Sequence, residues 1–258
     1  MKLSIQNKIK KELFIAIFQC LKNCNSIITL IFRKDGLFIQ GMDKSHVCMF
    51  ELFLKKTWFQ IYENAEKDNP LSLDSHTFST VLNFLNDSYN VEIYQEGEEN
   101  YLNIDLIKMD GTSGEFSKYF KIPLADVDNE ILSLPTIDYD AEFTINSKKI
   151  CEITSQMLLF GTDMEIECTE EKIQFITNGI TGDMSVNIPM DDLKEYSISE
   201  GEIIHLKYSL SYISKMCLSG KLSSNVDFSI SCDYPMKIHY ELEEDSFLNF
   251  HIAPKIVD

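Results

Sequence analysis

Lysines at helical spacing near the start of the chain have the charge and geometry to meet an anionic partner. Lys8, Lys11 and Lys22 lie at offsets of 0, 3 and 14 along the predicted helix Lys8–Lys22. A helix turns by about 100° per residue, so the three ammonium groups share one face, which suits the phosphate oxygens of nucleic acid. The alternative is that such lysines are simply solvated. Four more lysines begin, occupy or follow two later predicted helices: Lys148, Lys149, Lys215 and Lys221.

Signatures of catalysis are absent from the sequence. It contains no GxxxxGK[ST], GxGxxG, GxSxG or HExxH spacing, and none of its five histidines lies four residues from another. Carboxylates come in runs typical of solvated turns, for example Glu96, Glu98 and Glu99. We therefore expect no enzymatic activity and no cofactor. A metal-dependent hydrolase that uses one of the carboxylate clusters is the alternative from another functional class.

The composition indicates a globular protein with a strongly acidic surface. The chain has 258 residues, of which 44% are hydrophobic, and 23 Lys and Arg against 41 Asp and Glu give a net charge of −18. This charge argues against a protein that coats nucleic acid with its whole surface. It is compatible with lysines concentrated on one face.

Cysteine usage and hydropathy indicate where the protein works. The seven cysteines are odd in number and form no CxxC pair, so reduced thiols are expected in place of disulfides or a metal site. No uncharged run approaches the roughly 18–20 residues of a membrane span. Lysines are scattered through the first residues, where a signal peptide would have an apolar core. We expect a soluble protein with no membrane partner.

The order of predicted elements is repeated in the two halves of the chain. Each half reads helix, strands, helix, strands, and Asp35-Gly36 between apolar runs predicts a hairpin. An acidic stretch with prolines near both ends separates the halves. The pattern predicts an α+β protein with two similar domains, at residues 1–122 and 137–258, joined by a connector at 123–136. The predicted helices are Lys8–Lys22, His76–Leu85, Lys149–Leu159 and Ser209–Leu218.

Two motifs some 200 residues apart carry a family resemblance. They are Gln40-Gly41-Met42-Asp43-Lys44-Ser45-His46-Val47 and Leu248-Asn249-Phe250-His251-Ile252-Ala253-Pro254-Lys255-Ile256. In this order they closely resemble the eukaryotic sliding clamps of the proliferating cell nuclear antigen family. The resemblance implies two clamp domains with the DNA clamp fold, and a homotrimeric ring closed head to tail. The helices would then line a central channel around duplex DNA, with antiparallel sheets outside.

The resemblance also implies the roles of particular residues. The lysines that would face DNA are Lys8, Lys11, Lys22, Lys148, Lys149, Lys215 and Lys221. Other helix positions where the family usually carries a basic residue are uncharged or acidic here, such as Thr80 and Glu152. Edge strands near Asp110–Lys118 and Thr177–Ser185 would pair between subunits.

A docking surface for partner proteins is the second implied site. In this family, peptides with a Gln-x-x-hydrophobic-x-x-aromatic-aromatic pattern bind beside the interdomain connector. The matching positions here are Met42, His46, Val47, Met49, Leu132, Leu134, Pro135, Tyr234, Pro235, Ala253, Pro254, Lys255 and Ile256. Exposed Met, Leu and Pro side chains are usual at a binding site.

These observations lead to one functional prediction and one rival. We predict a DNA sliding clamp, a polymerase processivity factor that encircles duplex DNA and docks replication and repair proteins. An ATP-dependent clamp loader would open the ring. The protein would act in the nucleus, or at a cytoplasmic replication site if it is viral. The rival is a monomeric or dimeric clamp-like accessory factor that binds DNA without encircling it, which the reduced helix charge favours.

Overall fold

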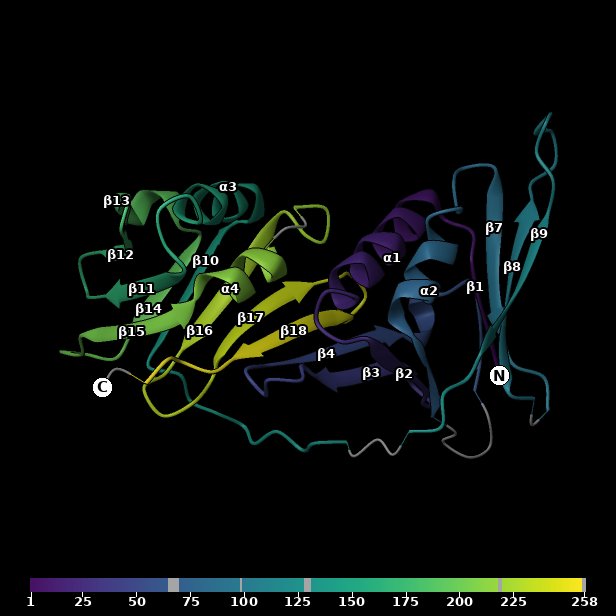
Figure 1. Cartoon of the computed structure of the whole chain (residues 1–258), viewed down its shortest axis with the longest axis horizontal. Coiled ribbons are helices and arrows are strands. Elements are labelled where there is room, and N and C mark those ends of the chain that lie inside the picture. The colour runs from purple at the N-terminus through teal and green to yellow at the C-terminus, as the bar shows by residue number, and fades with distance from the viewer. Residues whose placement is uncertain (65–69, 98, 128–130, 218–219, 257–258) are drawn as a thin grey trace. The chain divides into compact units, whose positions relative to one another are not determined.

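The computed structural model describes residues 1–64, 70–97, 99–127, 131–217 and 220–256 (Figure 1). The chain divides into two compact units. The first comprises Met1–Met42, Glu51–Leu132 and Leu242–Phe247, and the second Asp43–Phe50, Ser133–Glu241 and Leu248–Asp258. Parts of the predicted connector and the predicted helix end at Leu218 lie outside the described residues. The domain boundaries at 122/123 and 136/137 remain predictions.

The first half of the chain follows the order strand, helix, five strands, helix, three strands. Its elements are β1 (Lys2–Ile5), α1 (Lys8–Leu21), β2 (Ile27–Phe32), β3 (Gly36–Met42), β4 (Cys48–Lys55), the 3-10 helix η1 (Lys56–Trp58), β5 (Ile61–Glu63), β6 (Leu71–Asp74), α2 (Ser75–Leu82), β7 (Tyr89–Tyr94), β8 (Tyr101–Lys108) and β9 (Lys118–Pro123). They form sheets in the orders β5-β1-β7-β8-β9 and β4-β3-β2-β6.

The second half repeats this order element by element. Its elements are β10 (Ala141–Asn146), α3 (Ser147–Met157), β11 (Asp163–Cys168), β12 (Ile173–Gly179), β13 (Gly182–Ile188), the 3-10 helix η2 (Met190–Asp192), β14 (Glu195–Ile198), β15 (Ile204–Ser209), α4 (Leu210–Cys217), β16 (Asn225–Ile230), β17 (Met236–Glu241) and β18 (Phe247–Ile252). The corresponding strand orders are β14-β10-β16-β17-β18 and β13-β12-β11-β15. The predicted duplication is therefore present in the fold.

Apolar stripes on the helices pack into the core of each unit. In the first unit, the rings of Phe14, Phe18 and Phe78 join α1 to α2, with ring centroids 4.8 Å apart for Phe18 and Phe78. In the second unit, Phe143 stacks on Phe228 at 5.0 Å across the β10–β16 pair. Burial of these rings stabilises each unit, because it removes a large apolar surface from water. In the first unit, burial of Phe14, Phe18 and Phe78 fixes which faces of α1 and α2 stay in solvent.

The four predicted helices and the Asp-Gly hairpin are confirmed. The hairpin closes between β2 and β3, where Phe32 faces Leu37. Gly36 is required there, because a Cβ atom would lie 2.2 Å from the Leu54 carbonyl oxygen. The sequence pattern indicates no strand at β1, β6 or β14, each of four residues. They are too short to show a clear alternating pattern, and pairing with neighbouring strands specifies them.

Side-chain caps fix where three of the helices begin, and α3 offers the clearest test. The Asn146 side chain accepts the backbone N–H groups of Lys148 at 3.0 Å and Lys149 at 3.3 Å. We predict that Asn146→Ala lowers the free energy of unfolding by about 0.5–2 kcal/mol. Urea denaturation measures this loss. Ser155→Ala, an exposed position in the same helix, is the control and should change stability by less than about 0.5 kcal/mol.

Candidate functional site

Helix α1 presents its lysines in different environments. The helix begins at Lys8 because the Asn7 side chain accepts the Lys10 N–H at 3.1 Å. Lys8 is mostly exposed and forms an ion pair with Asp87 at 2.5 Å, which raises the pKa of Lys8. Lys22 caps the other end of the helix and is half-buried. Lys8 and Lys22 therefore keep access to solvent.

Lys11 is the exception among the predicted DNA-facing lysines. Only 3% of its surface is exposed, and its ammonium group donates to the Tyr89 carbonyl oxygen at 2.6 Å. Burial lowers the pKa of Lys11, and the Coulomb attraction of Asp87 opposes this. The helical rotation of about 100° per residue predicts that Lys11 lies beside Lys8. Lys11 also borders the apolar stripe of α1, and its aliphatic chain is buried there. We correct the prediction accordingly: Lys11 supports the structure and does not face a phosphate.

The lysines of the second unit are exposed. Lys149 lies 3.5 Å from Glu152 one turn further along α3. On α4, the ammonium group of Lys215 lies 5.7 Å from the centroid of the Tyr212 ring. Such exposed contacts hold a side chain weakly, so these charges can still reach a phosphate. The exposed lysines of this unit are Lys148, Lys149, Lys215 and Lys221.

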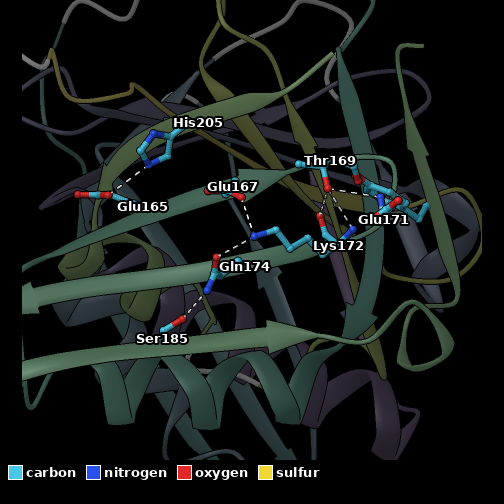
Figure 2. Close-up of polar contacts among 9 residues, drawn as sticks. Glu165, Glu167, Thr169, Glu171, Lys172, Gln174, Ser185 and His205 are labelled. Carbon is cyan, nitrogen blue, oxygen red and sulfur yellow. Dashed lines mark hydrogen bonds and ion pairs between the residues drawn. The ribbon is translucent and has the colours of Figure 1, made fainter. Parts of the chain in front are cut away.

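The outward face of the β13-β12-β11-β15 sheet is covered by polar side chains that pair with one another (Figure 2). Lys172 contacts Glu167 at 2.8 Å and Gln174 at 3.2 Å. His205 contacts Glu165 at 3.2 Å. The intervening residues of β11, such as Ile166, are buried, so the strand alternates between core and solvent. Lys172 is thereby held within an acidic surface.

In the first unit, Gln40 fixes the connector. Its side-chain amide donates to the Leu132 carbonyl oxygen at 2.9 Å, and its side-chain oxygen accepts the Leu132 N–H at 2.7 Å. This pair of hydrogen bonds leaves the Leu132 side chain 41% exposed. Met42, at the end of β3, is half-buried. The predicted docking residues of this unit are thus held beside solvent.

In the second unit, Asp43 organises the loop that carries His46 and Val47. Its carboxylate is buried and accepts the N–H groups of Val47 at 2.8 Å and Cys48 at 2.7 Å. The Tyr212 hydroxyl donates to it at 2.6 Å. Burial alone would raise the pKa of Asp43, but these hydrogen bonds outweigh burial and lower it.

The C-terminal segment lies against the same loop. The Ala253 N–H donates to the Val47 carbonyl oxygen at 2.9 Å, and the Lys255 N–H donates to the Lys207 carbonyl oxygen at 2.7 Å. Met49 is only 6% exposed, so we correct its assignment from partner contact to core. The other predicted docking residues of this unit are exposed or half-buried: His46, Val47, Leu134, Pro135, Tyr234, Pro235, Ala253, Pro254, Lys255 and Ile256.

Comparison with known proteins decides the family. Residues 6–131 match the model of the N-terminal domain of proliferating cell nuclear antigen, and residues 133–255 match the model of its C-terminal domain. The chain belongs to the proliferating cell nuclear antigen family. A relative of that name from Chaetomium thermophilum is 27% identical over 98% of this chain and 96% of its own. Relatives named proliferating cell nuclear antigen 2 are similar too: 26% identical in Plasmodium falciparum (97% and 98% covered) and 23% in Drosophila melanogaster (94% and 93%).

Membership of the proliferating cell nuclear antigen family confirms the predicted function and fold. The protein is a DNA sliding clamp and processivity factor with two clamp domains, and its partners are DNA, copies of itself and replication proteins. The family is one of non-enzymatic clamps. Within the described part of the chain, no three His, Cys, Asp or Glu side chains are grouped to hold a metal ion. None of the described helices is long and apolar enough to cross a membrane.

Sequence reasoning missed four residues that support the sites. Gln40 and Asp43 lie inside the quoted motif, but their roles depend on contacts that the motif does not reveal. Tyr212 lies 169 residues from Asp43 and carries no sequence signal of the contact. Asp87, the partner of Lys8, was also unassigned.

The buried position of Lys11 gives a prediction that separates support from DNA contact. Lys11→Met removes the donor to the Tyr89 carbonyl oxygen. We expect a loss of about 1–3 kcal/mol in the free energy of unfolding, measured by urea denaturation, and an unchanged salt dependence of DNA binding. Lys149→Met, at an exposed position, should leave the free energy of unfolding unchanged and reduce the salt dependence of DNA binding. Equal stability of the two variants would contradict this placement of Lys11.

Proposed function

We propose that three copies of this chain form a closed ring in which β9 of one copy pairs with β13 of the next. The observation that carries the proposal is the state of the sheet edges. Edge strands expose unpaired backbone N–H and C=O groups. Natural proteins therefore keep edge strands short, cover them or pair them with another strand. Among the described strands, the edge strands of six or more residues are β9, β13 and β15, and of these only β15 is met by another segment of the chain.

The remaining sheet edges are short or covered. Strands β5, β6 and β14 have only three or four residues. Strand β6 is also met by the connector, since the Ala125 N–H donates to the Ser72 carbonyl oxygen at 2.7 Å. Strand β15 is met by the C-terminal segment through Lys255 and Lys207. These edges have little capacity left for a partner.

Apolar side chains accompany the two open edges. Next to or within β9, Phe116 is 78% and Tyr119 71% exposed, and Phe84 stacks on Phe120 at 5.9 Å. Between β12 and β13, Ile180 is fully exposed. Large apolar side chains gathered at an open edge favour burial against another chain.

The internal duplication supports the choice of partner strands. Strand β9 corresponds to β18 in the element order, and β13 corresponds to β4. Strands β4 and β18 are neighbours within the chain, where the Lys55 N–H donates to the Ser246 hydroxyl at 3.0 Å. Pairing β9 with β13 between copies would repeat that arrangement. Such a contact is head to tail and closes when its rotation completes a ring.

The predicted lysines that reach solvent then supply the surface that faces DNA. This set comprises Lys8, Lys22, Lys148, Lys149, Lys215 and Lys221. Weak, salt-dependent contacts with phosphates permit sliding, while the acidic remainder of the surface repels DNA. Lys8 must leave Asp87 to reach a phosphate, and this exposed ion pair is weak enough to exchange.

Docking and loading complete the proposed function. The exposed residues beside the connector and the C-terminal segment would bind peptides of the Gln-x-x-hydrophobic-x-x-aromatic-aromatic pattern. An ATP-dependent loader would open the ring, and the clamp itself would have no catalytic activity. The word nuclear in the relatives' names supports action in the nucleus.

Solution mass tests ring formation directly. Light scattering on a sizing column should give three chains of 29.8 kDa, 89.4 kDa in total, that persist on dilution. Ile180→Asp places a charge on the β13 side of the interface, so we expect its mass to fall towards 29.8 kDa. Ile203→Asp, at a residue 71% exposed outside both edges, is the matched control and should stay trimeric.

The opposite result would favour the rival function. A wild-type mass of 29.8 kDa at every concentration would contradict a closed ring of the free protein and favour a monomeric accessory factor. A trimer that Ile180→Asp leaves intact would show that the ring forms through other strands.

A further inference from the structure

The loop between β3 and β4 has a strained and closely bonded conformation. His46 adopts φ = +56°, a left-handed conformation that non-glycine residues rarely adopt. The His46 N–H donates to the Asp43 carbonyl oxygen at 3.0 Å, and the Asp43 N–H donates to the Cys48 carbonyl oxygen at 2.8 Å. Surrounding contacts must hold such a conformation in place.

The Asp43 carboxylate supplies most of those contacts. One oxygen accepts the N–H groups of Val47 and Cys48, and the other accepts the Ser45 N–H at 3.0 Å. These donors belong to the loop itself or to its junction with β4. Hydrogen bonds to a buried carboxylate are strong because the acceptor is charged.

Tyr212 provides a further donor to the carboxylate, from outside the loop. Its hydroxyl on α4 donates to Asp43 at 2.6 Å, and the Tyr212 side chain is half-buried. This hydrogen bond therefore connects the Asp43 loop to helix α4. Val47 in turn connects the loop to the C-terminal segment, because its carbonyl oxygen accepts the Ala253 N–H.

We propose that Tyr212 is a positioning residue for the docking surface. Its hydroxyl orients the Asp43 carboxylate, which sets the conformation of residues 44–47 and, through Val47, the place of the segment Ala253–Ile256. The role in partner binding rests on the docking function proposed above. The role in ordering the loop does not.

Tyr212→Phe tests the proposal by removing one oxygen atom. The ring beneath Lys215 remains, so ring mass and DNA binding should be unchanged. Amide hydrogen exchange at Val47 and Cys48 should become about 5- to 20-fold faster, because the carboxylate loses a strong donor. Affinity for a synthetic peptide of the Gln-x-x-hydrophobic-x-x-aromatic-aromatic pattern, measured by fluorescence anisotropy, should fall about 3- to 10-fold.

Tyr240→Phe is the matched control. The Tyr240 hydroxyl also donates to α4, to the Met216 carbonyl oxygen at 3.1 Å, but it lies outside the loop. We expect exchange at Val47 and Cys48 and the peptide affinity to stay within about twofold of wild type. Asp43→Asn is the second variant, should Tyr212→Phe fold poorly. It keeps the side-chain shape, removes the charge, and should also speed exchange at both amides.

The two readouts separate this inference from the docking function. Unchanged exchange in Tyr212→Phe, or an equal increase in Tyr240→Phe, would overturn the positioning role. Faster exchange in Tyr212→Phe with no peptide binding by the wild-type protein would uphold the ordering of the loop and overturn the docking function. Faster exchange with wild-type peptide affinity would overturn the part of the proposal that concerns partner binding.

Discussion

Unpaired sheet edges are the constraint on which the rest of this structure depends. The chain shortens β5, β6 and β14, covers β15 with the C-terminal segment, and pairs β4 with β18. Only β9 and β13 are both long and open among the described strands. In the duplicated topology, β13 corresponds to β4 and β9 corresponds to β18. Strands β4 and β18 pair within the chain, whereas β13 and β9 each keep one edge that no described strand pairs with. The proposed ring would pair both of these edges.

Charge is distributed so that an acidic protein can still hold DNA. The net charge of −18 is carried in part by strand faces such as that of β11, where Glu165 and Glu167 pair with His205 and Lys172 (Figure 2). Apart from the buried Lys11, the predicted DNA-facing lysines reach solvent, and the contacts of Lys8 and Lys149 are exposed ion pairs, which are weak. Encirclement removes the need for tight binding, so a few screened contacts are sufficient. This balance suits a clamp that must slide.

The sequence predicted the elements better than the details of the sites. Apolar residues at helical spacing identified the four α-helices of the described residues, because burial of one stripe defines a helix face. The short strand β1 could not be predicted, because it is specified by pairing with β5 and β7, which lie far along the chain. The prediction for Lys11 was wrong because the angle around a helix indicates which way a side chain points, but not whether it is buried. The contact of Tyr212 with Asp43 joins residues 169 apart, which no local pattern reports.

Topological retention on DNA tests encirclement most directly. The labelled protein is threaded at high concentration over the open ends of linear DNA, the ends are blocked with streptavidin, and the sample is washed at about 1 M salt, where the Debye length is about 3 Å. Encirclement predicts that the protein stays bound in this wash and leaves when a restriction enzyme cuts the DNA. Release by salt from blocked DNA would contradict it, because only charge would then have held the protein.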